Sequence, residues 1–124
     1  MTEIEFEKAV VELAHMFGWQ VASFRPAQTG KGWRTPVKYD GKGYPDLTLI
    51  HPTGRIVFAE LKAAKGRPSP EQSDWILSLC ACAIQINECL NHDGERVSCF
   101  VWKPSDAQHI ADVLSFGRVT YWAL

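Results

Sequence analysis

The chain has 124 residues, 46% of them hydrophobic and 22% charged, with a formal net charge of −1 at pH 7. These values predict one globular domain over residues 1–124, long enough to bury a core. No apolar run approaches the ~20 residues of a membrane helix, and the acidic N-terminus is unlike a signal peptide, so we expect a cytoplasmic protein without membrane attachment. The four cysteines lack the spacing of zinc ligands and are expected to be reduced, mostly buried thiols.

The charge is unevenly distributed along the chain. Between Arg25 and Arg67, nine Lys or Arg residues stand against three acids, so this segment carries +6 and the remainder −7. Such asymmetry predicts a polyanionic partner near the basic segment. The alternative is a solvated lysine-rich loop that binds nothing.

Residues 3–17 are predicted to form an amphipathic helix with Thr2 as its N-cap. Its apolar stripe comprises Phe6, Ala9, Val10, Leu13, Ala14 and Phe17. Glu3 and Glu7 lie one turn apart on the flank of this stripe, where Glu7 can reach a site at the edge of a sheet. The alternative for Glu7 is a solvated carboxylate in the first turn, stabilised by the helix dipole.

A first strand is predicted over residues 19–24, and the following stretch, residues 25–44, has no periodicity. It contains four glycines and interleaves three aromatic residues with basic ones. About 20 structureless residues inside a compact domain are usually functional or disordered. Because basic side chains neutralise phosphates and aromatic rings stack on unpaired bases, we interpret this stretch as a substrate-facing loop.

Two apolar runs, 47–50 and 56–62, are predicted to form a hairpin with a five-residue loop over residues 51–55. Asp46 opens the first strand, directly after Pro45. On the second strand, alternation places Glu60 and Lys62 on one face and the apolar residues between them on the other. Three charged groups at the end of an apolar hairpin are unfavourable unless a ligand or metal compensates them. The chemistry is therefore expected here; the alternative is an exposed salt-bridged face.

The second half of the chain continues with a basic loop over residues 63–68 and a helix from Ser69 to about Leu90. Gln72 either closes a capping box with Ser69 or orients a water or phosphate near the hairpin end. The buried stripe of this helix is predicted to comprise Ile76, Leu79, Ala83, Ile86 and Leu90. A strand over 96–103, a helix over 105–116 capped by Ser105, and a short strand over 119–122 complete the prediction.

The order of these features resembles the PD-(D/E)XK nuclease superfamily, with Pro45-Asp46 and Glu60-Leu61-Lys62 as its two motifs. More narrowly, the chain resembles the VRR-NUC family in its short, stand-alone, phage-type form. The blocks that support this are Phe24-Arg25-Pro26-Ala27, Gly32-Trp33-Arg34-Thr35-Pro36, Gly41 to Leu47, Phe58 to Lys62, Ser69-Pro70-Glu71-Gln72 with Trp75, and Val101 to Asp106. The resemblance implies a restriction-endonuclease-like α/β core, a central mixed sheet flanked by helices. It also implies an origin in a phage or prophage.

The chemistry expected of the motifs is metal-dependent phosphodiester hydrolysis. Mg²⁺ or Mn²⁺ polarises phosphate and acidifies water, and carboxylates are its natural ligands. Asp46 and Glu60 supply two ligands and the Leu61 carbonyl a third, while Lys62 positions water or stabilises charge on the phosphate. Glu7 also looks like the first-helix glutamate of archaeal Holliday-junction resolvases, and Glu3 is its rival as a metal ligand.

The sequence thus predicts a Mg²⁺- or Mn²⁺-dependent DNA endonuclease, with Asp46, Glu60, Lys62 and Gln72 as catalytic residues. The basic residues assigned to DNA binding are Arg25, Lys31, Arg34, Lys38, Lys42, Lys65 and Arg67. The second long helix carries apolar residues beyond its buried stripe, namely Trp75, Leu77, Cys82 and Ile84. They predict a homodimer that prefers branched DNA, in the manner of a Holliday-junction resolvase. The alternatives are an inactive DNA-binding module, a flap or non-specific nuclease, and a small-molecule enzyme.

Overall fold

A mixed four-stranded sheet forms the centre of the structure. The computed structural model describes residues 1–25, 27–29, 32–34, 37–90 and 95–115. The sheet has the order β1-β4-β5-β6, from Gln20–Ser23, Leu47–His51, Arg55–Leu61 and Val97–Trp102. β1, β4 and β5 are antiparallel neighbours, and β6 is parallel to β5. The expected α/β fold with a mixed sheet is confirmed.

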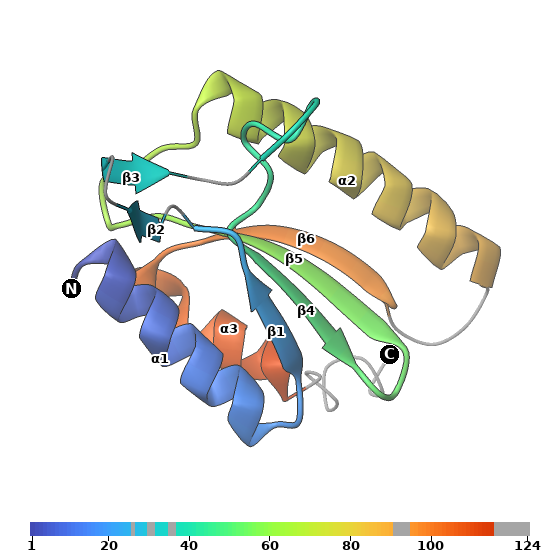
Figure 1. Cartoon of the computed structure of the whole chain (residues 1–124). Coiled ribbons are helices and arrows are strands. Elements are labelled where there is room, and N and C mark those ends of the chain that lie inside the picture. The colour runs from blue at the N-terminus through green and yellow to red at the C-terminus, as the bar shows by residue number, and fades with distance from the viewer. Residues whose placement is uncertain (26, 30–31, 35–36, 91–94, 116–124) are drawn as a thin grey trace.

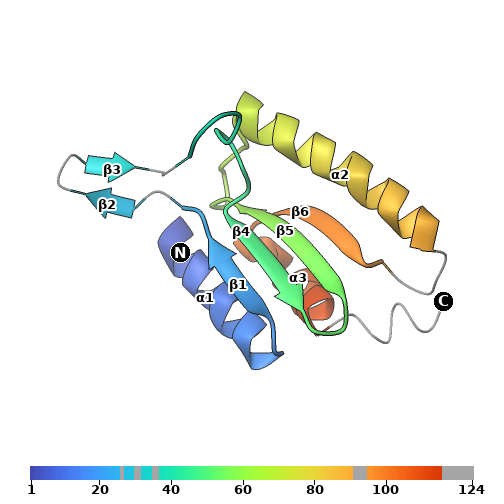
Figure 2. The same ribbon diagram turned by 45° about the vertical axis from the view of Figure 1, so that its right-hand side comes forward.

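Helices cover both faces of the sheet (Figure 1). α1 (Glu3–Met16) and α3 (Ala107–Leu114) lie against one face, and α2 (Pro70–Leu90) lies on the other. α2 is the crossover between the parallel strands β5 and β6, and it packs mainly against β6. The face of β1 and β4 that points toward the α2 side is therefore less covered than that of β6 (Figure 2).

The core lies between the sheet and the pair α1 and α3. It follows from strand alternation, because every second residue of β4 and β5 points to this side. The buried cluster comprises Phe6, Val10, Ala14, Trp19, Leu47, Leu49, Val57, Ala59, Leu61, Trp102, Ile110, Val113 and Leu114. The residues between them on β5, including Glu60, point to the α2 side, so Glu60 lies on the opposite face from Ala59 and Leu61, as predicted.

The β4–β5 hairpin is tighter than expected. His51 pairs with Arg55, so three residues rather than five make the turn. Gly54 adopts a φ of +94°, a conformation that glycine tolerates without strain. The prediction failed because the ends of the turn themselves pair as strand residues.

α1 begins at the predicted Thr2 cap, which forms a capping box with Glu5. The predicted stripe is narrower than expected, since Ala9 and Phe17 are exposed. Glu3 and Glu7 are half-buried on its flank, as the periodicity predicted.

α2 begins with the predicted capping box, in which Gln72 Oε1 accepts from Ser69 N and Gln72 N donates to Ser69 Oγ. Its buried stripe was partly wrong. Ile86 is 42% exposed, whereas the polar Asn87 faces inward and forms hydrogen bonds with the backbone of Arg96 and Val97. The prediction of Ile86 as a buried residue was wrong because the last turns of α2 lie over the start of β6. There Asn87 binds backbone groups of β6, and no apolar side chain is buried in its place.

Two further segments differ from the prediction. Residues 25–44 contain a small antiparallel pair, β2 (Ala27–Thr29) and β3 (Gly32–Arg34), which extends from the end of the sheet (Figure 2). Ser105 does not cap a helix but lies in the 3₁₀ turn Pro104–Asp106, where Asp106 accepts from Lys103 N.

Some predictions lie outside the described residues. These are the strand over 119–122 and Phe116, the predicted end of the last helix. Within the described ranges, no helix is both long and apolar enough to cross a membrane. All four cysteines are free, but Cys82 and Cys89 are exposed, so the expectation of mostly buried thiols was wrong for those two.

Candidate active site

Two acidic side chains face each other where β4 begins and β5 ends. Leu47 pairs with Ala59, so one further step of this antiparallel register places Asp46 opposite Glu60. Directly opposite residues share a face of the sheet, which makes the two carboxylates neighbours on the α2 side. Both residues are buried, Asp46 at 8% exposure and Glu60 at 1%. The predicted convergence of Asp46, Glu60 and Lys62 is present.

Backbone hydrogen bonds hold Asp46 in place. Leu61 N donates to Asp46 Oδ2 at 2.9 Å, and Phe24 N donates to the Asp46 carbonyl at 2.7 Å. Burial raises the pKa of the Asp46 carboxyl above its ordinary value, while the Leu61 N–H, Arg25 and Lys62 act in the opposite direction. Asp46 therefore joins the ends of β1, β4 and β5.

Glu60 is less well compensated. Neither of its carboxylate oxygens accepts a hydrogen bond of good geometry among the described residues, although Lys62 Nζ lies 3.3 Å from Oε2. Burial raises the pKa of Glu60, and the facing Asp46 carboxylate raises it further, to about 7. The Lys62 ammonium acts in the opposite direction. A buried carboxylate with unsatisfied oxygens is unfavourable unless a proton or cation is bound to it.

Arg25 lies among three carboxylates. Its Nε is 2.7 Å from Glu7 Oε2, its Nη2 is 3.2 Å from Glu3 Oε1, and its Nη1 is 3.4 Å from Asp46 Oδ2. Ser23 Oγ also donates to Glu7 Oε1 at 2.6 Å. The sequence prediction assigned Arg25 to DNA binding and missed this ion-pair network. The segment's positive charge was visible in the sequence, but which acids lie beside Arg25 depends on how α1 packs against β1.

The choice between Glu3 and Glu7 as a metal ligand stays a prediction. Both carboxylates form ion pairs with the Arg25 guanidinium, and the distance is shorter for Glu7 (2.7 Å) than for Glu3 (3.2 Å). Among the described residues, no group of three or more Asp, Glu, His or Cys side chains is assembled for a metal ion. The Asp46 and Glu60 carboxylates are suited to a hard divalent cation, because such cations prefer oxygen ligands. Both Glu60 oxygens also lack a hydrogen-bond partner among the described residues.

The remaining predicted residues are Gln72 and six Lys or Arg residues. Gln72 Oε1 accepts a hydrogen bond from Ser69 N in the capping box, and the catalytic role of Gln72 stays a prediction. Lys38, Lys42, Lys65 and Arg67 are exposed, and Lys42 forms a loose 3.9 Å pair with Glu71. The Arg34 side chain and Lys31 lie outside what the structure describes.

A family model, the VRR-NUC domain, matches residues 13–93 of the chain. The chain belongs to the VRR-NUC family. The match includes Asp46, Glu60 and Lys62, whereas Glu3 and Glu7 precede it. A search of curated proteins found no match.

This VRR-NUC domain is therefore a nuclease domain, and its family implies DNA as the substrate. The buried carboxylate pair and its ammonium lie inside the matched region, so the site described here is the candidate centre of that activity.

The raised pKa of Glu60 predicts a pH-dependent stability. Between pH 4.5, its ordinary pKa, and about 7, folded Glu60 keeps a proton that the unfolded chain has released. Raising the pH across this range should therefore lower the unfolding free energy of the metal-free protein, by on the order of 1–3 kcal/mol. Chemical denaturation between pH 4.5 and 8 measures this. Glu60→Gln should flatten the profile, whereas the exposed Glu12→Gln should leave it unchanged; an equal slope in all three proteins contradicts the assignment.

The Arg25 network predicts a stability effect that a DNA-binding side chain would not have. Arg25→Ala leaves three carboxylates close together without their shared cation, and should lower the unfolding free energy by about 2–4 kcal/mol at pH 7. The matched control is Lys42→Ala, whose side chain is 80% exposed, and it should change stability by less than about 0.5 kcal/mol. Equal, small effects of both variants would contradict the network.

Proposed function

We propose that this VRR-NUC domain is a Mg²⁺- or Mn²⁺-dependent DNA endonuclease that hydrolyses phosphodiester bonds at Asp46, Glu60 and Lys62. The observation that carries the proposal is the buried carboxylate pair, one member of which has unsatisfied oxygens and an ammonium at 3.3 Å. A buried salt bridge is favourable only when further hydrogen bonds satisfy its carboxylate oxygens, and none is found for Glu60 among the described residues. The arrangement supports a cation site beside a positioned amine.

In this proposal Asp46 and Glu60 hold the metal, with the Leu61 carbonyl as a further oxygen ligand. When bound, the metal would polarise the phosphate and acidify a water. The Leu61 N–H fixes the orientation of the Asp46 carboxylate. Glu60 must release its proton to act as a ligand, because ligands bind metals in their deprotonated form. Lys62 orients the attacking water and stabilises negative charge that develops on the phosphate.

Arg25 has a different role from the one its charge alone predicted. Its guanidinium balances Glu3, Glu7 and Asp46, and only 19% of its side chain is exposed. We assign it to charge compensation within the site, with Glu7 as the acid through which α1 joins the site. DNA phosphates are assigned to the exposed cations Lys38, Lys42, Lys65 and Arg67, together with Lys31 and Arg34 from the sequence prediction.

The proposals of a homodimer and of branched DNA as its substrate are based on exposed apolar residues of α2. Leu77 and Ile84 are two turns apart on one face and are 68% and 59% exposed. Trp75, which the sequence prediction placed on this surface, is half-buried and donates to Asp40 O. We propose that a second subunit covers Leu77 and Ile84, and that the resulting two-fold pair of sites cuts branched DNA. A flap or non-specific nuclease, or an inactive DNA-binding module, is the alternative.

The activity is tested by removing one carboxylate at a time. Asp46→Asn and Glu60→Gln should lower cleavage by about 100-fold or more while DNA binding persists, because the lost groups act on the reaction rather than on DNA affinity. Cleavage of linear, flap and four-way-junction DNA is measured with Mg²⁺, with Mn²⁺ and with a chelator, and Glu12→Gln is the control. Undiminished cleavage by Asp46→Asn would reject the site. Equal cutting of duplex and junction would leave a nuclease without structure selectivity.

The dimer is tested by adding one charge to its proposed interface. Light scattering at micromolar concentration should give twice the 13.9 kDa of one chain. Ile84→Glu should halve the measured mass, because an ionised carboxylate cannot be buried without a partner. Gln85→Glu adds the same charge at the neighbouring exposed position and should leave the dimer intact. A single-chain mass for the unaltered protein contradicts the dimer.

A further inference from the structure

A pocket of about 330 Å³ opens beside the candidate site. We propose that it binds one unstacked nucleobase of the DNA strand that is being cut. The lining residues are Phe24, Val37, Lys38, Gly41, Lys42, Gly43 and Tyr44. This inference rests on the proposed nuclease function and narrows its substrate to DNA with an unpaired nucleotide at the cleavage point.

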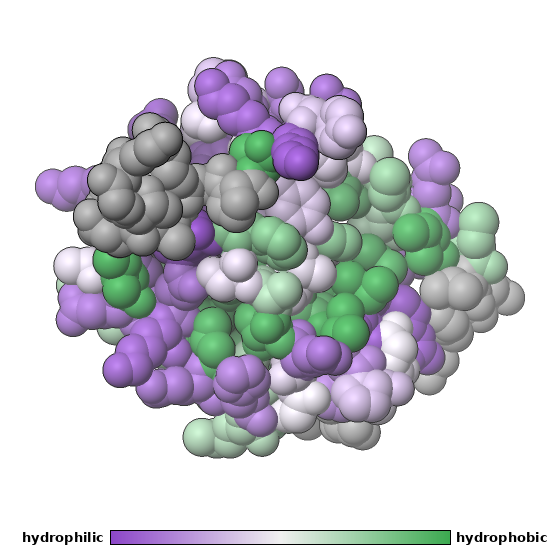
Figure 3. All heavy atoms as spheres, in the orientation of Figure 1, coloured by the Kyte–Doolittle hydropathy of each residue, from purple (hydrophilic) through white to green (hydrophobic). Residues whose placement is uncertain are grey.

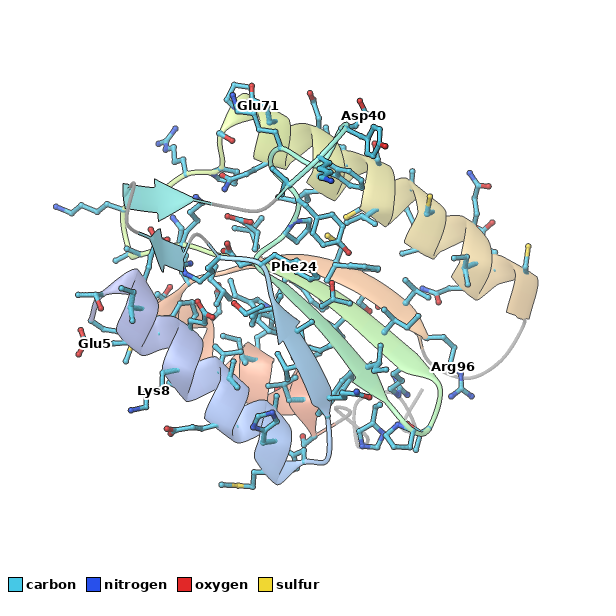
Figure 4. The ribbon with its side chains drawn as sticks, in the orientation of Figure 1. Glu5, Lys8, Phe24, Asp40, Glu71 and Arg96 are labelled. Atoms are coloured by element: carbon cyan, nitrogen blue, oxygen red, sulfur yellow. The ribbon has the colours of Figure 1, made fainter. Side chains whose placement is uncertain are left out.

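Two residues of the pocket lining, Phe24 and Tyr44, lie close to Asp46. Tyr44 precedes Asp46 by two residues, and Phe24 N donates to the Asp46 carbonyl at 2.7 Å. Ser23 pairs with Leu47, so one further step of this antiparallel register places Phe24 opposite Asp46 and on the same face of the sheet. Figure 4 shows Phe24 at the end of the strands, beside the start of β4 and the end of β5. A base in this pocket would therefore bring its own backbone phosphate to the carboxylates.

The walls have the chemistry that a nucleobase needs. The rings of Phe24 and Tyr44 meet edge to face at 5.2 Å, and Tyr44 in turn contacts Trp75 at 5.1 Å. Phe24 is nevertheless 42% exposed, so an aromatic surface is left open to a ligand. Aromatic rings stack on any base, and the exposed cations Lys38 and Lys42 at the rim suit the flanking phosphates.

The pocket lies on an apolar part of the surface. Figure 3 shows apolar side chains gathered in the middle of the face that carries the open side of the sheet. An apolar concavity with cations at its rim matches a flat aromatic base attached to an anionic backbone. A purely polar or anionic small molecule would leave the apolar wall unused.

The loop of residues 37–44, which lines most of the pocket, is held in place without a ligand. Trp75 Nε1 donates to Asp40 O at 3.0 Å, which ties the loop to α2. Gly43 has a φ of +88° and packs so tightly on the first turn of α2 that a Cβ would lie 2.5 Å from the Glu71 carbonyl carbon. Tyr44 Oη forms a hydrogen bond with Thr48 Oγ1. A preformed wall binds a ligand without the entropic loss of ordering it.

A duplex cannot use this pocket while its bases remain stacked. Flipping a paired base requires unstacking and unpairing energy, and a base that is already unpaired needs the least. The pocket therefore favours single-stranded tails, gaps and branch points over continuous duplex, and it fixes the cut relative to the unpaired base.

The test compares DNA strands that differ by one missing base. Abasic sites are placed one at a time along a single-stranded oligonucleotide, and binding is measured with Asp46→Asn so that no strand is cut. One abasic position should weaken binding about tenfold, because stacking on an aromatic ring contributes about that factor. The same position carrying 2-aminopurine should change fluorescence on binding. Equal affinity for every abasic strand overturns the pocket, since all strands carry the same phosphates.

Two variants place the effect at the pocket. In the Asp46→Asn background, Phe24→Ala removes the open aromatic face and Val37→Trp fills the space from a side chain that is already 41% exposed. Each should abolish the abasic effect and the 2-aminopurine signal. Ile50→Ala is the matched control: this apolar residue of the same sheet face is 43% exposed, lies outside the lining and should preserve both signals. If Phe24→Ala does not fold, Val37→Trp decides alone; unaltered signals in Val37→Trp overturn the proposal.

The outcome also separates this inference from the nuclease assignment. Position-dependent binding without cleavage by the unaltered protein keeps the pocket and rejects the nuclease function. Cleavage with binding that ignores base loss keeps the nuclease and rejects the pocket.

Discussion

The register between β4 and β5 is the constraint on which the site depends. It sets Asp46 opposite Glu60 on one face of the sheet, where both are buried. Burial raises the pKa of both carboxyl groups, and the facing Asp46 carboxylate raises that of Glu60 further. An N–H from Leu61 and an ammonium from Lys62 oppose these shifts. A slip of one residue would turn the carboxylates into the core and Leu61 out of it.

The same alternation allocates the two faces of the sheet to different tasks. Leu47, Ala59 and Leu61 point into the core with α1 and α3, while the residues between them face α2. α2 packs mainly on β6, and Phe24, which follows β1, remains 42% exposed beside the carboxylates. The stability of the fold and the chemistry of the site are thus built from alternating residues of the same strands.

Arg25 connects α1 to the hairpin of β4 and β5. Through it, Glu3 and Glu7 of α1 are linked to Asp46 at the start of β4. The guanidinium suits this position because its several N–H donors point in different directions within one plane, which a lysine ammonium cannot reproduce with the same geometry. Helix, first strand and hairpin are therefore coupled by electrostatics at the site as well as by apolar packing below it.

Local sequence patterns were enough to predict the two strands of the hairpin, the face shared by Glu60 and Lys62, and the capped starts of α1 and α2, because each depends on residues close together in the chain. The VRR-NUC resemblance followed from the order of those motifs. The positions of Arg25 among acids, of Asn87 rather than Ile86 on the inward face, and of Phe24 and Tyr44 at a pocket became visible only in the folded structure. These features depend on how α1 and α2 are placed against the sheet, and periodicity within one element carries no information about its distance to another.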